Sequence, residues 1–420
     1  MKVAGIITEY NPFHNGHKFH IEETRRITGA DYVIAVMSGN FVQRGAPAII
    51  DKYSRTLMAL HNGVDLVFEL PVCYASASAE FFALGAVSLL HKLGIVDAIC
   101  FGSECGDLPL LKETAQYLHA PGKNFDIFLR SFLREGLTYP AARRRALQAD
   151  LLLKGNYSGN PGAISGVLGE PNNILGIEYL KALQTLSSTI RPYTILRQES
   201  HYHDPVLSEN ISSATAIRHT ILGTSEDDLL SALRDTLPSQ VVSSLSDAYH
   251  KIFPITEEDF SGMIKYKILS EASRLTDYVD LSADLADRIN HCDLHLSLQQ
   301  LALAIKTKNI TLTRVNRALF HMLLNIRKTD LQGFNESGYT AYARVLGLKK
   351  NASFLLRNIG EAGNIPLITK AAKAKEQLDP SGFLMLSQDL FASHLYQQIV
   401  YEKFGTSLPN EYRRGICIVS

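Results

Sequence analysis

The sequence predicts an α/β fold with a doubly wound, Rossmann-like parallel sheet, followed by a mainly α-helical region. Apolar runs rich in β-branched residues alternate with helical patterns over the first hundred residues. Polar, glycine-containing loops follow these runs, and helical spacing dominates beyond residue 225. We therefore expect an α/β domain over residues 1–225, with a helical insertion at about 106–165, and a mainly α-helical domain over residues 226–420.

The predicted elements follow the chain in order. The first strand begins at Val3 and ends at an Asn-Pro step, after which a helix is predicted over residues 17–28. Further strands are predicted at residues 32–37, 65–70, 97–101 and 191–197. Helices are predicted from a cap at Asp51 to about residue 61, over residues 76–93, 108–118, 125–133 and 141–153, and opening near residues 172 and 213. In the last domain helical spacing covers residues 227–237, 260–274, 281–305 and 314–326.

Composition excludes a membrane span and a secreted, disulfide-rich class. With 46% hydrophobic and 20% charged residues the chain is typical of a globular protein, and no segment reaches the run of about 18 apolar residues that spans a bilayer. The chain enters its first apolar run directly after Met1 and Lys2, without a signal peptide, so we expect a cytoplasmic location with no membrane contact. Five cysteines with no repeated C-x-x-C pattern argue against a disulfide framework and a structural zinc site.

The turn after the first strand carries the candidate catalytic residues. It places His14, Gly16 and His17 at the start of the predicted helix, where free backbone N–H groups and the helix dipole favour an anion. The glycine allows close approach, and two imidazoles can donate hydrogen bonds to phosphate oxygens. Simple helix capping is the alternative interpretation of the two histidines.

Polar loops after the other strands are further candidates, because ligands of such sheets bind beyond the carboxyl ends of the strands. The loop after the second strand offers Ser38, Asn40, Gln43 and Arg44 to a phosphate or carboxylate. After the fourth strand come Gly102, which lets backbone lie against a nucleoside, and Glu104, whose carboxylate suits a sugar hydroxyl or Mg²⁺. Each loop also fits a tight turn that needs Gly and Asn.

The remaining candidates lie between residues 169 and 218. Asn172 opens a helix that it can cap, or it can contact a base edge, and the fifth strand ends on Arg197. At the next helix start, Ser212 and Ser213 with Arg218 form a second predicted anion site. Between these segments, His201, His203 and Asp204 either contact the nucleotide or cytidine or form an ordinary polar loop.

These motifs together resemble a known family. His-x-Gly-His after a first strand is similar to the signature of the nucleotidyltransferase superfamily. Thr-Glu-Tyr-Asn-Pro-Phe-His-Asn-Gly-His, Ser-Gly-Asn-Phe-Val-Gln-Arg-Gly, Phe-Gly-Ser-Glu, Pro-Asn-Asn-Ile-Leu-Gly and Ile-Ser-Ser-Ala-Thr-Ala-Ile-Arg jointly resemble the bacterial tRNA(Met) cytidine acetate ligase family. One departure is that Ala214 stands where the superfamily has threonine, which leaves the role of Thr215 open.

The resemblance implies ATP-dependent N4-acetylation of the wobble cytidine of elongator tRNA(Met), with acetate, ATP and the tRNA as partners and Mg²⁺ accompanying ATP. It implies electrostatic catalysis by His14 and His17, with Lys18, Arg44 and Arg218 as further phosphate candidates. The ATP site that it implies consists of Ile7, Thr8, Glu9, Tyr10, Asn11, Pro12, Phe13, His14, Asn15, Gly16, His17, Lys18, Phe19, His20, Gly102, Asn172 and Arg197.

Basic residues cluster in the predicted helical region at Lys306, Lys308, Arg314 and Arg317, where Thr313 is expected to cap a helix that presents both arginines. A solvated helical face explains any one such cluster. Contact with tRNA phosphates explains this cluster taken together with the other basic residues of the region, which are Lys349, Lys350, Arg357, Lys370, Lys373 and Lys375. The net charge is zero, so a nucleic-acid surface must come from local clusters of this kind. We expect this cluster to contact the tRNA.

Two other classes of function remain open. One is a small-molecule adenylyltransferase that uses the same His-x-Gly-His site, and the other is a non-catalytic nucleotide-binding or RNA-binding module. Turnover of ATP to AMP and pyrophosphate separates the enzymes from the module, and dependence on acetate separates the two enzymes. The sequence indicates no obligate protein partner. It also indicates no resident metal, because His291 and His295 share a helix face but lack a third ligand.

Overall fold

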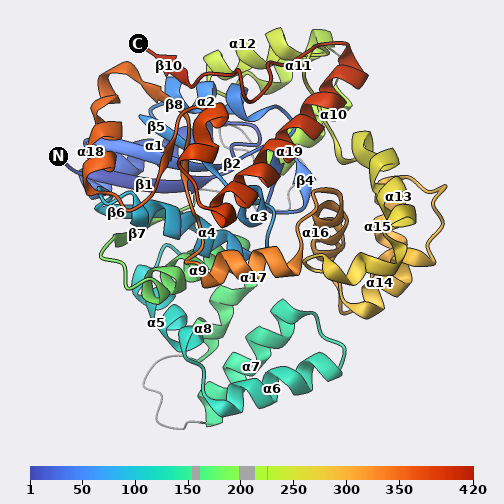
Figure 1. Ribbon diagram of the computed structural model, residues 1–420. Helices are drawn as coiled ribbons and strands as arrows, with labels where there is room; N and C mark the ends of the chain where they lie inside the picture. The colour runs from blue at the N-terminus through green and yellow to red at the C-terminus, as the bar shows by residue number, and fades with distance from the viewer. Residues whose placement is uncertain (154–160, 198–212, 225) are drawn as a thin grey trace.

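A mixed, mostly parallel sheet forms the centre of the computed structural model, which describes residues 1–153, 161–197, 213–224 and 226–420. Within these residues the sheet has eight strands in the order β10-β8-β5-β2-β1-β6-β7, and β9 also pairs with β8 (Figure 1). The strands are β1 (Val3–Thr8), β2 (Tyr32–Ser38), β5 (Leu66–Leu70), β6 (Ala98–Ser103), β7 (Arg191–Leu196), β8 (Ala343–Lys349), β9 (Leu367–Ile368) and β10 (Cys417–Val419). A separate pair is formed by β3 (Phe41–Val42) and β4 (Ala46–Pro47).

Strand β1 lies in the middle of the sheet and pairs in parallel with β2 on one side and β6 on the other. The chain therefore reverses its direction of winding at β1, and the crevice beyond the carboxyl end of such a strand is where open α/β sheets bind ligands. The turn that carries His14 and His17 leaves β1 at this end. The predicted fold class, an α/β fold with a mostly parallel sheet and a helical C-terminal region, is confirmed.

Both faces of the sheet are buried, which explains its continuous apolar runs. Side chains alternate between two cores, so that Val33 and Ala35 of β2 pack in one and Ile34 packs in the other. Helices α1, α2 and α10 to α12 cover the first face, and α4, α9, α18 and α19 contribute to the second (Figure 1).

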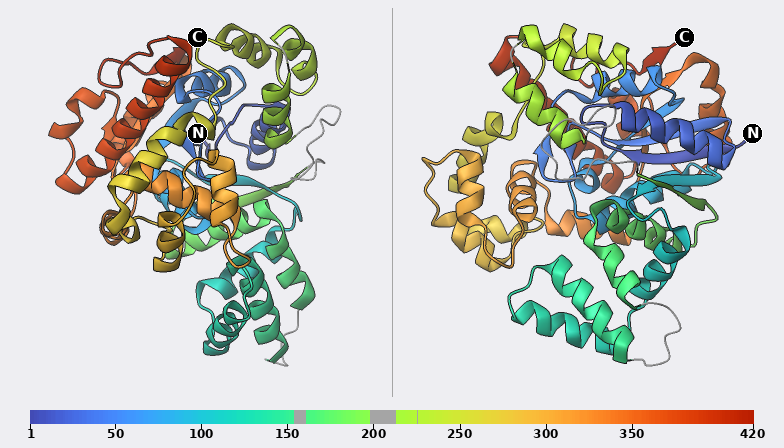
Figure 2. Two further views of the ribbon diagram at one scale, coloured as in Figure 1. Left: turned by 90° about the vertical axis from the view of Figure 1, so that its right-hand side faces the viewer. Right: turned by 180° about the vertical axis from the view of Figure 1, so that it is seen from behind.

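The helices largely follow the predicted segments, including α2, which Asp51 caps by accepting hydrogen bonds from the backbone N–H groups of Tyr53 and Ser54. They are α1 (Asn15–Thr28), α2 (Lys52–His61), α3 (Val72–Ala75), α4 (Ala79–Lys92), α5 (Leu108–His119), α6 (Lys123–Arg134), α7 (Tyr139–Leu153), α8 (Pro161–Gly166), α9 (Pro171–Thr185), α10 (Ala214–Gly223), α11 (Glu226–Leu233), α12 (Ser239–Ala248), α13 (Ser261–Ser270), α14 (Ala283–Asn290), α15 (Leu298–Ile305), α16 (Leu312–Leu323), α17 (Lys328–Glu336), α18 (Phe354–Ala362) and α19 (Pro380–Phe404). Short 3-10 turns are η1 (Val167–Gly169), η2 (Glu257–Phe260), η3 (Ala272–Asp277), η4 (Lys350–Ala352) and η5 (Ala371–Glu376). Figure 2 shows α6 and α7 projecting away from the sheet, while α13 to α16 lie beside it. None of the helices in the described ranges has the length and apolar character needed to cross a bilayer.

The C-terminal half also supplies strands to the sheet, which its helical pattern did not lead us to expect. Strand β8 pairs antiparallel with β5, and β10 pairs with β8. Strand β8 carries Arg344, a charged residue in a buried run, whose partners lie far away in the chain. Local periodicity cannot reveal such a strand, because its burial depends on distant ion partners. The sheet thus crosses the proposed boundary near residue 225, which stays a prediction.

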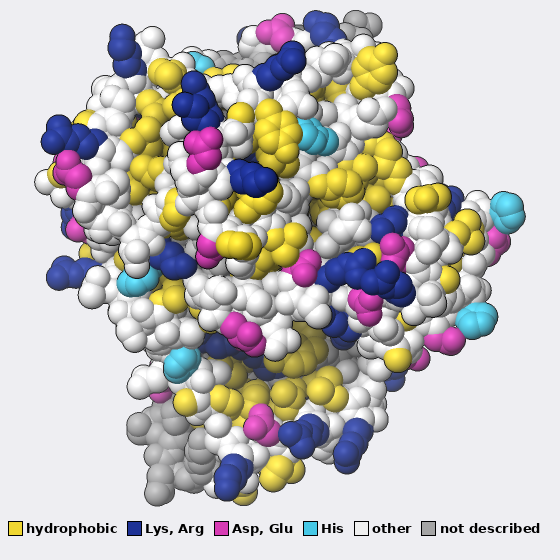
Figure 3. All heavy atoms as spheres, in the orientation of Figure 1, with side chains coloured by type: hydrophobic (Ala, Val, Ile, Leu, Met, Phe, Trp, Pro, Cys, Tyr) yellow, Lys and Arg dark blue, Asp and Glu magenta, His cyan; other side chains and the backbone are white. Residues whose placement is uncertain are grey.

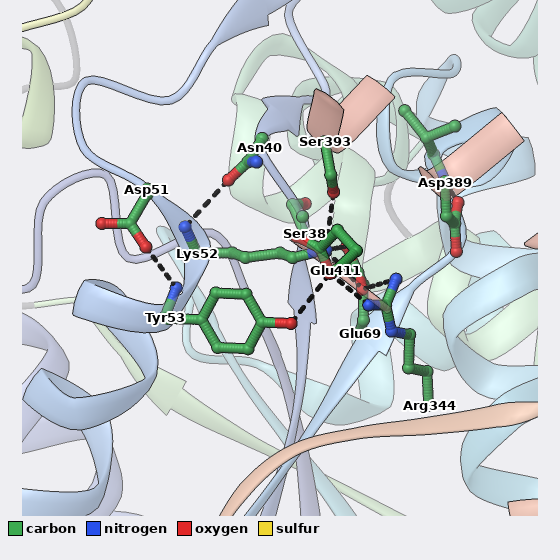
Figure 4. Close-up of polar contacts among 12 residues, drawn as sticks. Ser38, Asn40, Asp51, Lys52, Tyr53, Glu69, Arg344, Asp389, Ser393 and Glu411 are labelled. Carbon is green, nitrogen blue, oxygen red and sulfur yellow. Dashed lines mark hydrogen bonds and ion pairs between the residues drawn. The ribbon is translucent and has the colours of Figure 1, made fainter. Parts of the chain in front are cut away.

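A buried ionic network joins the C-terminal segment to the sheet (Figure 4). The ammonium of Lys52 lies 2.8 Å from Glu69 Oε1 and 3.4 Å from Glu411 Oε1. The guanidinium of Arg344 pairs with Glu69 at 3.1 Å and with Glu411. The hydroxyl of Tyr53 donates to Glu411 at 2.8 Å. Desolvation alone would raise the pKa of the Glu411 carboxyl, but the positive charges of Lys52 and Arg344 lower it to about 2. The two positive and two negative charges of this network offset each other, and all four side chains are buried away from water.

We predict that Glu411→Gln lowers the free energy of unfolding by about 3–5 kcal/mol, because it leaves buried Lys52 and Arg344 with a single carboxylate between them. Urea unfolding followed by circular dichroism measures the change. Glu376→Gln, on an exposed 3-10 turn, is the control and should stay within about 0.5 kcal/mol of the wild type. A decrease below about 1 kcal/mol for Glu411→Gln would show that the network contributes little.

Candidate nucleotide-binding site

A cavity of about 240 Å³ opens at the carboxyl ends of β1, β6 and β7. The predicted ATP residues that line it are Ile7, Thr8, Glu9, His14, Gly16, His17, Phe19, His20, Gly102, Asn172 and Arg197. Of the further predicted phosphate candidates it includes Gln43, Arg44, Ser213 and Arg218. No site role is predicted for the other lining residues, which are Phe82, Phe101, Leu175, Tyr179, Ile195, Leu196, Ala214 and Thr215. Most of the missed residues are apolar, so no chemical signal distinguishes them from ordinary core residues.

The two motif histidines form a stacked pair at the start of α1. Their ring centroids are 3.7 Å apart with an interplanar angle of 28°, and the edge of Tyr10 approaches His17 at 4.9 Å. The backbone N–H of His14 donates to Nδ1 of His17 at 3.2 Å. Because Nδ1 of His17 is an acceptor, its neutral ring carries the proton on Nε2 and offers one N–H donor. The helix begins two residues earlier than predicted, so His17 lies in its first turn.

Burial keeps the histidines of the cavity uncharged. It lowers the pKa of His14 to about 3 and of His20 to about 4, and it lowers the pKa of His17 well below its ordinary value. The positive charge of Arg197 acts in the same direction on all three rings. At neutral pH the rings are therefore hydrogen-bonding groups without charge.

Three guanidinium groups, those of Arg44, Arg197 and Arg218, line the cavity together with one carboxylate, that of Glu9, among the described residues. Burial lowers the pKa of each arginine, but arginine stays charged in proteins. The positive charge of the site thus comes from arginines and the neutral donors from histidines. This combination suits a polyphosphate.

Backbone and side-chain contacts hold Arg218 and Arg197 in place. Arg218 donates to the backbone oxygen of Asn11 at 2.8 Å and to the hydroxyl of Thr215 at 3.2 Å. This contact gives Thr215 a role in orienting the guanidinium. Arg197 lies over Gly102, where a Cβ would come within 3.1 Å of its Cγ, and reaches Asn172 Oδ1 at 3.5 Å. Glycine at residue 102 therefore makes room for the arginine.

Glu104 holds the start of α9. Its carboxylate accepts hydrogen bonds from the side chain of Asn172 at 2.6 Å and from the backbone N–H groups of Asn172 and Asn173 at 3.1 and 2.7 Å. Both oxygens therefore hold the start of α9, and Glu104 is not among the residues that line the cavity. Its contact with a sugar hydroxyl or Mg²⁺ stays a prediction.

Eight predicted residues do not line the cavity, namely Tyr10, Asn11, Pro12, Phe13, Asn15, Lys18, Ser38 and Asn40. Several have structural partners. Asn11 Oδ1 accepts from Ile49 N at 2.8 Å, and Asn40 Oδ1 accepts from Lys52 N at 2.8 Å. Lys18 is exposed and lies 3.9 Å from Glu22. Their contact with ATP stays a prediction, and Ser212, His201, His203 and Asp204 lie outside the described residues.

Comparison with known proteins places this chain in a family. A family model described as HIGH Nucleotidyl Transferase matches residues 1–410. A tRNA(Met) cytidine acetate ligase of Acetivibrio thermocellus is 40% identical over 100% of both chains, and one of Clostridium perfringens is 41% identical over 94% of this chain and 95% of its own. The chain belongs to the tRNA(Met) cytidine acetate ligase family. The resemblance drawn from the motifs is confirmed.

Solved structures agree with this assignment to the acetate ligase family. The crystal structure of Thermotoga maritima TmcAL in its apo form I superposes with a TM-score of 0.92 at 29% identity and covers 100% of both chains. The same protein bound with alpha-thio ATP superposes with a TM-score of 0.90 at 29% identity, again over 100% of both chains.

The basic cluster predicted to contact tRNA lies at and before helix α16, which Thr311 caps by accepting from Arg314 N at 3.3 Å. The prediction of Thr313 as the cap was wrong, because the helix begins two residues earlier and Thr313 lies in its first turn. Arg317 is bound to Asp280 at 2.7 Å and is mostly buried, whereas the side chain of Arg314 is 39% exposed and lies 3.9 Å from the same carboxylate.

The cluster adjoins the cavity. At Gly45, next to Arg44 of the cavity, φ is +71° and a Cβ would overlap the backbone of Arg317. The loop that lines the nucleotide site therefore rests directly on α16, and only glycine fits there. Lys306 and Lys308 are both exposed, between α15 and α16.

We predict that the histidines make folding sensitive to acid. The unfolded chain protonates its histidines below about pH 6.5, whereas His14 stays neutral in the folded protein down to about pH 3. The unfolded state thus binds more protons in this window, so the free energy of unfolding falls as the pH falls, by about 1.4 kcal/mol per pH unit for each such histidine. Urea unfolding between about pH 6 and 4 measures the slope.

His14→Asn should flatten this slope by about 1.4 kcal/mol per pH unit. His291→Asn is the control, because the side chain of His291 is 77% exposed. Equal slopes in the wild type and His14→Asn would contradict the neutral state of His14.

Proposed function

We propose that this protein acetylates the wobble cytidine of elongator tRNA(Met) to N4-acetylcytidine, using acetate and ATP. The observation that carries the proposal is the cavity at the end of β1, where a stacked pair of neutral histidines faces a set of three arginines in a chain of this ligase family. The name of the relatives supplies the tRNA, the cytidine and the acetate, and the Thermotoga maritima structure with alpha-thio ATP supports the nucleotide. We infer that it acts in the cytoplasm, where tRNA and ATP are available.

The first step in this proposal activates acetate. A carboxylate oxygen of acetate attacks the α-phosphate of ATP in line, which forms acetyl-adenylate and releases pyrophosphate. Charge develops on the phosphate oxygens, and the N–H donors of His14 and His17 stabilise it together with Arg44, Arg197 and Arg218. No covalent enzyme intermediate is needed, so no nucleophilic side chain is assigned.

Mg²⁺ would accompany ATP through the phosphates in this proposal. No group of three or more His, Cys, Asp or Glu side chains that could hold a metal occurs among the described residues. Because Mg²⁺ often keeps several waters and binds nucleotide phosphates through few protein ligands, a dedicated cage is not required.

The second step brings the tRNA to the same cavity, and the surface beside α16 is the proposed contact. Figure 3 shows Lys and Arg side chains grouped over this helix. A groove of about 590 Å³ lies beside Arg314 and is also lined by Phe81 and Lys328. Phe82, the next residue along α4, lines the nucleotide cavity, so groove and cavity lie on either side of this point. We infer that the tRNA lies along the groove with its cytidine entering the cavity.

Acetate-dependent exchange of labelled pyrophosphate into ATP tests the first step. We expect exchange in the presence of acetate and a decrease of about 10²- to 10³-fold in His17→Ala, because a preorganised donor to the developing charge is removed. His291→Ala, an exposed histidine, is the control. A wild type without exchange would favour a binding module, and exchange that needs a phosphorylated substrate instead of acetate would favour a small-molecule adenylyltransferase.

Salt-dependent tRNA binding tests the second step. We expect the combined change Lys306→Ala, Lys308→Ala and Arg314→Ala to weaken binding of tRNA(Met). The slope of log affinity against log salt should fall by about 0.7 to 0.9 for each tRNA phosphate that the variant no longer neutralises. Arg317→Ala is left out of this set, because it also breaks the pair with Asp280.

Arg26→Ala is the matched control, since Arg26 is 70% exposed in the last turn of α1, a helix that lies away from α16 (Figure 1). Pyrophosphate exchange without tRNA should stay near the wild-type rate in the triple variant. Unchanged tRNA affinity and salt slope would reject the surface beside α16.

A further inference from the structure

Transfer of the acetyl group to cytidine needs a proton acceptor, which the arginines and histidines of the first step do not supply. The N4 nitrogen forms a bond to the acetyl carbon while the bond from that carbon to the phosphate oxygen breaks, and AMP leaves with the electron pair. The attacking nitrogen must also lose one proton. A positioned base typically contributes about 10²- to 10⁴-fold to such a step.

Among the described residues that line the cavity, one titratable group is a candidate for this proton acceptor. Arginine has no acceptor atom, so Arg44, Arg197 and Arg218 are excluded. Nδ1 of His17 already accepts the backbone N–H of His14, and its other nitrogen carries the ring proton. His14 and His20 are disfavoured as bases, because a ring that accepted the proton would become a buried cation beside Arg197, whereas a carboxylate that accepts it becomes neutral. Burial raises the pKa of Tyr179, which therefore keeps its proton.

Glu9 is the carboxylate that remains. It follows the last residue of β1, is half-buried, and lines the cavity. Its Oε1 accepts the backbone N–H of Gln43 at 2.9 Å, which fixes the position of the group. Its Oε2 accepts no hydrogen bond from the residues that the structure describes. One oxygen is thus anchored and the other is available to a substrate.

Glu9 is also connected to α16, the helix beside which the tRNA is proposed to bind. Its anchor, Gln43, belongs to the loop that continues through Arg44 to Gly45, and Gly45 rests on the backbone of α16 at Arg317. A short loop therefore connects the carboxylate to the helix of the proposed tRNA surface. Arg44, Arg55 and Arg218 are the guanidinium groups that interact electrostatically with Glu9.

We propose that Glu9 is the general base of acetyl transfer, accepting the proton from the N4 amine of cytidine as the nitrogen attacks acetyl-adenylate. This inference rests on the proposed function. The proton passes to Oε2, the acetyl group passes to N4, and AMP is released. Glu9 thereby acts after the adenylation that the histidines and arginines support.

Glu9→Gln is a sharp test, because the amide oxygen of glutamine still accepts from Gln43 N but the group is no longer a base. Two rates are compared, acetate-dependent pyrophosphate exchange and single-turnover transfer from preformed acetyl-adenylate to tRNA(Met). We expect transfer to fall at least about 100-fold and exchange to fall less than about tenfold.

Glu22→Gln on α1, whose side chain is 62% exposed, is the control. Glu9→Asp, which keeps a carboxylate, should recover part of the transfer rate and serves also if Glu9→Gln does not fold. An equal decrease of exchange and transfer, or a decrease of exchange that excess Mg²⁺ restores, would overturn the proposal in favour of a role in adenylation. Transfer at the wild-type rate would also overturn it. Absence of exchange in the wild type would instead refute the proposed function itself.

Discussion

Four buried charges, Lys52, Glu69, Arg344 and Glu411, tie the last residues of the chain to the centre of the sheet (Figure 4). Removing such charges from water costs several kcal/mol for each ion, and this cost is offset only when every partner is in place. The four residues come from α2, β5, β8 and the segment after α19. The network therefore forms only when the complete chain has folded, and the C-terminal strands complete the sheet that carries the nucleotide site.

The network also reaches the candidate site through α2. Lys52 is the first residue of this helix, and Arg55 lies one turn further on, fully buried. The guanidinium of Arg55 donates to the backbone oxygens of Glu9 at 2.6 Å and of Ser38 at 3.0 Å, and also to that of Gly39. One buried side chain thus fixes the ends of β1 and β2, from which the loops of the cavity leave. Fixed loops are what a site needs if its donors are to act without reorganisation.

In the cavity, the positive charge and the uncharged hydrogen-bond donors come from different side chains. Burial keeps His14 and His17 neutral, so each ring donates without repelling the nearby arginines. The arginines retain their charge when buried, so they supply the attraction for phosphate. Glu9 lines the same cavity as Arg44 and Arg218, and it is the carboxylate to which we assign the proton transfer, since it becomes neutral on accepting a proton whereas a ring would become a cation.

Local patterns in the chain were enough to predict the strands and helices of the first half, the His-x-Gly-His turn and the family, because these depend on periodicity and short motifs. The same motifs brought Gly102, Asn172, Arg197 and Arg218 into the predicted site. Only the folded structure shows that β8 and β10 belong to the same sheet, since the burial of Arg344 depends on ion partners that are distant in sequence. The apolar wall of the cavity and the contact of the Gly45 loop with α16 likewise emerged only in three dimensions, because such contacts depend on packing between segments that no local pattern encodes.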